Sequence, residues 1–91
     1  MSTPYKSTPV FNEQTLPAAL RNNHSTKAGI WGKLRILSGS LMYTIADPYS
    51  EQHLSAGEYA MIQPEQLHKV TPLGAVQMQV EFYREHPHEQ E

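Results

Sequence analysis

The chain of 91 residues contains no cysteine, so disulfide bonds and zinc sites built on thiolates are excluded. It has no apolar run near the roughly 20 residues that a transmembrane helix needs. Its first residues, MSTPYKSTPVFNEQ, lack the hydrophobic core of a secretory signal. We therefore expect a cytoplasmic protein that has no membrane partner.

Clustered positive charge is absent as well. Seven Lys and Arg residues are outnumbered by nine Asp and Glu residues, and the basic residues are scattered along the chain. Nucleic-acid binding requires grouped cations that displace counterions, so no nucleic-acid partner is expected. A helix that lies on a membrane surface would need an amphipathic Lys- and Arg-rich stretch, and none is present.

Familiar catalytic motifs are missing too. There is no thiol nucleophile, and the single aspartate, Asp47, lies in an expected turn beside Pro48. The sequence has no G-x-S-x-G elbow, P-loop or G-x-G-x-x-G fingerprint. A Ser-His-Asp hydrolase is therefore disfavoured, and no catalytic residue is assigned.

What the chain does have is alternation of polar and apolar residues, broken by turns. Strand candidates recur at the spacing typical of an all-β sandwich or barrel, and we assign them to 33–37, 41–45, 52–54, 59–62, 67–71 and 75–83. Residues 38–40 and 72–74 are expected to turn the chain. One short helix is expected at 15–21, with Thr15 as its candidate cap.

The length allows a single domain, which we expect to span 1–91. Its core is expected at about 5–84. The polar ends, 1–8 and 85–91, are expected to be flexible or arm-like.

Five histidines are the first candidates for chemistry. His53 on a polar strand edge, and His86 and His88 in the tail, are expected to be solvated side chains. His24 precedes the first clear strand, and His68 lies near the start of a later one. A single histidine is more often structural than a ligand, so neither position alone establishes a site.

Glu81 is the candidate third member of a site. It lies in the longest predicted strand, on a face that it shares with Gln77 and Gln79, and the alternation favours exposure of that face to solvent. Two imidazoles and one carboxylate would suit a divalent metal with open positions. Such a set forms only if the strands converge in a barrel.

Three motifs carry a family resemblance: HSTKAGIWGKL at 24–34 with LSGSL at 37–41, AGEY at 56–59 with PEQLHKV at 64–70, and VEFY at 80–83. An N-terminal entry, TPVF at 8–11 and LP at 16–17, accompanies them. Together they resemble the TehB/YeaR-like family of small cupin domains associated with tellurite resistance. The similarity covers about positions 5–84. The combination H-x-T-K-x-G-x-W-G-x-L with P-x-x-x-H is fairly specific, whereas each piece alone is not.

The resemblance implies a cupin-type double-stranded β-helix, or jelly roll, which is often a homodimer. It implies a divalent metal in the barrel, zinc first and nickel, iron or manganese as alternatives, with His24, His68 and Glu81 as candidate ligands. The usual first cupin motif has two histidines and a glutamate, and here it keeps only His24. Lys27 is the candidate anion-binding residue; pairing with Glu81 or exposure to solvent are its alternatives.

Three functions follow. The first is a metal-binding cupin that captures a small anion or small molecule and takes part in resistance to tellurite or to oxidative and nitrosative stress. The second is a small metal-dependent enzyme of the dioxygenase or isomerase type, against which the reduced ligand set argues. The third is a metal-free ligand-sensing module, because a fold alone does not decide function.

Overall fold

The computed structural model describes residues 3–85, and within them the expected all-β class is confirmed. Its elements form one antiparallel sheet in the order β1-β6-β3-β4, with β2 paired to β6 and β5 paired to β3. The strands are β1 (Lys6–Ser7), β2 (Phe11–Asn12), β3 (Trp31–Ile45), β4 (Ser50–Ser55), β5 (Tyr59–Ile62) and β6 (His68–Tyr83).

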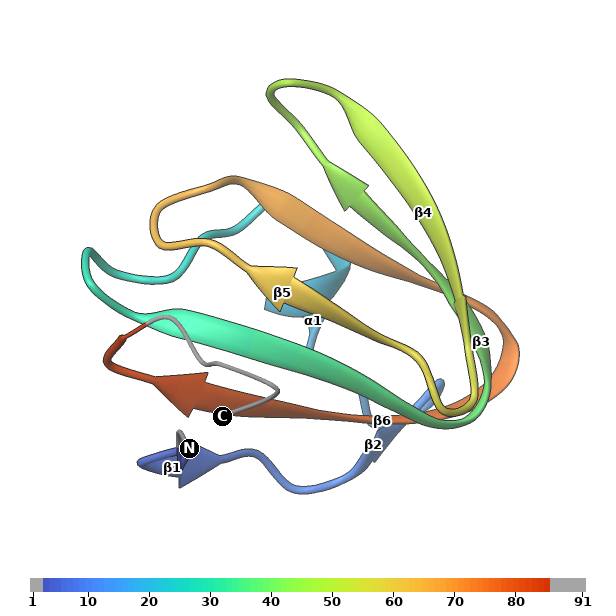
Figure 1. The fold of residues 1–91 in the computed structure, drawn as a ribbon. Helices are drawn as coiled ribbons and strands as arrows, with labels where there is room; N and C mark the ends of the chain where they lie inside the picture. The colour runs from blue at the N-terminus through green and yellow to red at the C-terminus, as the bar shows by residue number, and fades with distance from the viewer. Residues whose placement is uncertain (1–2, 86–91) are drawn as a thin grey trace.

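Two long strands, β3 and β6, pair along almost their whole length and bend together, so the sheet folds into two arms (Figure 1). The turns expected at 38–40 and 72–74 are wrong, because both segments lie inside continuous strands. The pairing of β3 with β6 shifts register between Ile36 and Ser38 and again between Gly39 and Leu41. Extra residues in one strand bend a sheet, which here replaces the expected hairpin.

Gly39 makes this bend possible. Its φ is +74°, and a Cβ placed on it would lie 2.0 Å from the carbonyl oxygen of Ala75 on β6. Any side chain would therefore push the two strands apart, whereas glycine lets the backbones approach.

The inner faces of the two arms enclose the apolar core. Leu34, Leu41 and Met78 are almost completely inaccessible to solvent. They share this core with other aliphatic side chains of the long strands, namely Ile36, Val70, Val76 and Val80. The alternation read from the sequence thus predicts which face of each long strand is buried.

The N-terminal segment lies along the second half of β6. Lys6 of β1 pairs with Phe82, and Phe11 of β2 pairs with Met78 (Figure 1). The segment 1–8 is expected to be flexible or arm-like, but Lys6 and Ser7 within it are held by strand pairing.

The helix is shorter than expected. It is a single turn, α1 (Ala18–Arg21), that begins after Pro17, so Thr15 does not cap it. The side-chain oxygen of Asn12 instead accepts hydrogen bonds from the backbone N–H groups of Gln14 and Thr15, both at 2.8 Å. Across residues 3–85, no helix has the length and apolar character needed to span a bilayer.

Candidate functional site

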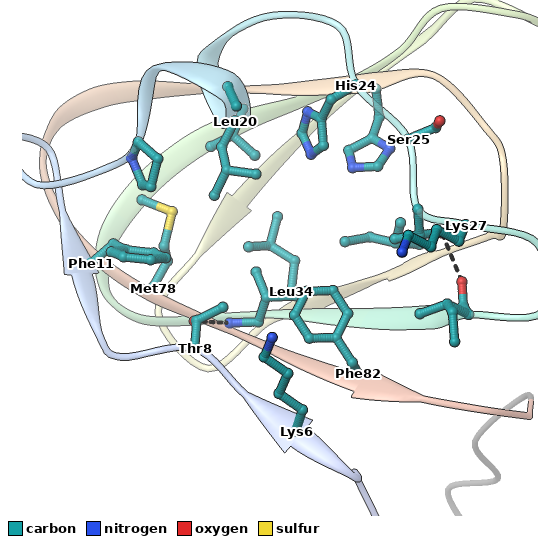
Figure 2. A pocket seen from close by; sticks show the side chains of 18 of the residues that line it. Lys6, Thr8, Phe11, Leu20, His24, Ser25, Lys27, Leu34, Met78 and Phe82 are labelled. Atoms are coloured by element: carbon teal, nitrogen blue, oxygen red, sulfur yellow. Dashed lines mark hydrogen bonds between the residues drawn. The ribbon is translucent and has the colours of Figure 1, made fainter.

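Two histidines that are far apart in the sequence lie side by side at one end of the fold. The backbone N–H of His24 donates to the carbonyl of His68, and the N–H of His68 donates to the carbonyl of His24, both at 2.9 Å. This two-way bridge ties the segment before β3 to the start of β6. It sets the two imidazole rings edge to face, with their centroids 4.1 Å apart (Figure 2).

Each of these rings is oriented by a carbonyl two residues earlier. Nδ1 of His24 lies 3.0 Å from the oxygen of Asn22, and Nδ1 of His68 lies 2.8 Å from the oxygen of Gln66. A carbonyl oxygen can only accept, so in the neutral rings Nδ1 carries the hydrogen. The lone pair of each neutral ring then sits on Nε2, the nitrogen that remains for a ligand.

The two histidines differ in burial. His68 is 1% exposed, whereas His24 is half-buried. Burial lowers the pKa of His68 from its ordinary value of 6.5, and nearby His24 lowers it further, while the hydrogen bond to the carbonyl of Gln66 acts in the opposite direction. His68 is therefore a neutral imidazole at pH 7, which is the form that binds metals.

Both imidazoles line a cavity of about 500 Å³ between the arms of the sheet. Figure 2 shows His24, Ser25 and Lys27 on one side of it and Leu20, Phe11 and Met78 on the other. The remaining wall is mostly apolar and comes from β3, β5 and β6: Leu34, Ile62, Val70, Val80 and Phe82.

Lys27 lines the same cavity, from a turn that leads into β3. The hydroxyl of Thr26 donates to the carbonyl of Ile30 at 2.7 Å, and the N–H of Ile30 donates to the carbonyl of Lys27 at 3.0 Å. Gly29 closes this turn with a φ of +79°. Thus the turn places the predicted anion-binding lysine on the wall of the same cavity that the two predicted histidines line.

Glu81 is not brought to these residues. Met78, Val80 and Phe82 of β6 line the cavity, so the alternation of side chains turns Glu81 to the opposite face of the strand. There its carboxylate accepts from Arg35 at 3.2 Å and from the hydroxyl of Tyr83 at 3.0 Å. The expected set of three ligands is therefore not formed, and neither is the alternative pair of Lys27 with Glu81.

Across 3–85, no three His, Asp or Glu side chains are grouped so that they could hold a metal ion. His53 is exposed on β4, opposite Met42, as expected of a solvated side chain. His86 and His88 lie outside the described residues.

Sequence reasoning missed the N-terminal contribution to the cavity. Lys6, Thr8 and Phe11 all line it, and Figure 2 shows the ammonium group of Lys6 pointing into it. The hydroxyl of Thr8 accepts from the N–H of Val80 at 3.1 Å, which holds this segment against β6. The one available signal was Val10-Phe11, an apolar pair in an otherwise polar segment.

This arrangement defines a small all-β domain with a pocket that has two imidazoles and two lysines on its wall. A family model described as the TehB-like domain matches residues 6–80, and the chain belongs to this TehB/YeaR-like family. The resemblance read from the sequence is thus confirmed.

Two relatives illustrate the range of the family. The chain is 32% identical over 74 residues to the probable S-adenosyl-L-methionine-dependent methyltransferase TehB of Haemophilus influenzae, a match that covers 76% of this chain and 26% of that protein. It is 31% identical over 74 residues to YeaR of Escherichia coli K12, covering 71% of this chain and 62% of YeaR. The match thus spans about a quarter of TehB and less than two thirds of YeaR.

Solved structures agree on the fold. The crystal structure of Haemophilus influenzae TehB superposes with a TM-score of 0.81 at 28% identity, over 89% of this chain and 30% of that one. A protein of Escherichia coli K12 gives 0.81 at 25% identity, over 94% and 93% of the two chains. FeII HppE gives 0.63 at 15% identity, over 81% and 40%, and this likeness concerns the fold alone.

Proposed function

We propose that the pocket binds a divalent metal ion through Nε2 of His24 and His68, with zinc as the first candidate and nickel, iron or manganese as alternatives. The observation that carries this proposal is the pair of hydrogen bonds from Nδ1 to the carbonyls of Asn22 and Gln66. Backbone carbonyls commonly orient metal-binding histidines in this way, and they leave Nε2 as the donor.

The donor set fits an open site better than a closed one. Structural zinc sites have four protein ligands and catalytic sites usually three. Two imidazoles leave most positions to water or to a bound anion, so metal binding is expected to be exchangeable. When bound, the metal would act as a Lewis acid toward an anion, and Lys27 would supply a second positive charge from the pocket wall.

The biological role proposed is capture of a small anion or small molecule during resistance to tellurite or to oxidative and nitrosative stress. Membership of the TehB/YeaR-like family supports this role. The methyltransferase activity in the name of TehB is not extended to this chain, because the match covers 26% of that protein.

A metal-free ligand-binding module is the second candidate function. The mostly apolar wall of the cavity favours this alternative. So does the absence, within 3–85, of a third side chain that could complete a metal site with His24 and His68. Treatment with a chelator distinguishes the two candidates. A metal-free module should still bind its ligand afterwards, whereas a metal-dependent site should not.

We propose that the bent sheet is a cupin-type jelly roll, and the two-armed shape of the sheet supports this proposal.

We propose a homodimer that pairs through β4, because β4 lies at the edge of the sheet and a partner strand can pair with its backbone. Light scattering coupled to gel filtration tests the dimer, with a mass near 10.3 kDa as the contradicting result. A cytoplasmic location is proposed with it and is tested by cell fractionation.

The metal proposal is tested by calorimetric titration of zinc into untagged, chelator-treated protein. The background carries His86→Gln and His88→Gln, so that the tail cannot bind metal. We expect about one zinc per chain, with binding lost in His24→Gln and in His68→Gln. The matched control is His53→Gln, an exposed histidine on β4, which should bind as the background does. Stoichiometric zinc in folded His68→Gln would contradict the assignment.

A further inference from the structure

The charged side chains that line the cavity are basic, although acidic residues outnumber basic ones in the chain as a whole. Among residues 3–85 no Asp or Glu lines the cavity. Lys6 and Lys27 both do, and within the same range the structure gives neither ammonium group an acidic partner. Because no carboxylate offsets them, these two charges give the cavity a positive potential that attracts anions.

Most of the wall, however, is apolar. Phe11, Leu20 and Met78 form one side of the cavity, and Leu34 and Phe82 lie between them and Lys27 (Figure 2). An inorganic oxyanion would interact with the polar side and leave this apolar surface in contact with water. Apolar surface contributes to binding only when the ligand covers it.

The volume of the cavity also favours an organic ligand over an inorganic oxyanion. About 500 Å³ lies within the range of roughly 300–1,000 Å³ that is typical of sites for organic small molecules. An oxyanion occupies only a few times the roughly 30 Å³ that one water molecule takes in the liquid. The cavity is therefore several times larger than such an ion requires.

We infer that the pocket binds an organic anion with an apolar body, such as a medium-chain carboxylate. Its charged head lies beside Lys27 and His24, and its body covers Leu20, Phe11 and Met78. Lys6 adds a second positive charge from the opposite wall. The inference rests on the proposed function only in taking this pocket as an anion site, and it requires no metal.

The inference is tested by titrating chelator-treated protein with acetate, hexanoate, octanoate and decanoate, followed by NMR or calorimetry. We expect affinity to rise by about tenfold for each added pair of methylenes, because each buried methylene contributes about 0.8 kcal/mol. Decanol, which has the same apolar body without the charge, should bind about tenfold more weakly than decanoate.

Variants assign this effect to the pocket. Lys27→Gln should weaken decanoate about tenfold and leave decanol unchanged, and Lys6→Gln should act in the same direction. Lys33→Gln is the matched control, because Lys33 does not line the cavity and lies over the ring of Tyr59. Leu20→Ser should flatten the dependence on chain length. Thermal unfolding of each variant establishes that it is folded.

The outcomes separate this inference from the metal proposal. Binding of decanoate that depends on chain length and on Lys27, in protein that takes up no zinc, supports the inference and contradicts the metal site. Zinc binding by protein whose affinity for carboxylates does not change with chain length overturns the inference and leaves the metal site in place. Equal affinity for decanol and decanoate also overturns it.

Discussion

Replacing His68 with alanine should destabilise the fold as well as remove a ligand. The imidazole is 1% exposed, and it packs against the ring of His24 and against Tyr43, whose ring centroid lies 5.5 Å away. Its Nδ1–H also donates to the carbonyl of Gln66. The substitution removes this packing and one hydrogen bond worth roughly 0.5–1.5 kcal/mol.

The size of the effect follows from where the ring lies. Truncating a large buried side chain to alanine costs roughly 2–5 kcal/mol when the space left behind stays empty. Because this ring borders an open cavity, water can fill the space and hydrate the carbonyl of Gln66, which reduces the cost. We expect a loss of about 2 kcal/mol, equivalent to a fall in Tm of roughly 10 °C for a domain of this size.

Thermal or urea unfolding followed by circular dichroism measures this loss, with His24→Ala and His53→Ala as graded controls. Because His24 is half-buried, His24→Ala should lose less than half as much stability as His68→Ala. Because His53 is exposed, His53→Ala should lose no measurable stability. The backbone bridge between residues 24 and 68 does not depend on either side chain. A Tm of His68→Ala within about 2 °C of the parent protein would refute the packing argument.

Four further outcomes are expected. Gly39→Ala should cost more than about 2 kcal/mol in urea unfolding, because its Cβ would meet the carbonyl oxygen of Ala75; a cost below about 0.5 kcal/mol would contradict this bend. Tyr43→Phe should leave stability unchanged or raise it by about 1 kcal/mol, because the buried hydroxyl has no hydrogen-bond partner within 3–85; marked destabilisation would reveal a partner. The pKa of His68 is lower in the folded protein than in the unfolded chain, so as the pH falls the unfolded chain takes up a proton before the folded protein does. The contribution of His68 to stability should therefore be complete above pH 6.5 and decrease as the pH drops below it. In His68→Gln the slope of that fall should be smaller, and an unchanged slope would contradict the assignment. Glu81→Gln should bind zinc as tightly as the parent protein, since its carboxylate faces away from the cavity; lost binding would restore it as a ligand.

Local alternation predicts the strands well and their joins poorly. The strand at Tyr59–Ile62 is predicted with its exact bounds, because turn residues flank a short apolar run. The segment around Gly39 is misread as a turn, since Ser-Gly-Ser suits a hairpin loop and a bulge equally. Only the pairing of β3 with β6 distinguishes the two, and that pairing joins residues far apart in the chain.

The same distinction applies to the site. No local pattern predicts that His24 and His68 lie close together. Only the family resemblance, in which each belongs to a motif, predicts it. Glu81, in contrast, already lies on the polar face of its strand by simple alternation, and the structure keeps it there. Lys6 could not be assigned, because its place in the cavity depends on the pairing of β1 with Phe82.

The most direct test of the account is the tautomeric state of the two imidazoles, measured by long-range ¹H–¹⁵N NMR at pH 7.5. The hydrogen bonds to Asn22 and Gln66 predict that neutral His24 and His68 both carry the hydrogen on Nδ1 and leave Nε2 unprotonated toward the pocket. Added zinc should shift both Nε2 resonances. A spectrum with the hydrogen of His68 on Nε2 would contradict the geometry on which the metal proposal depends.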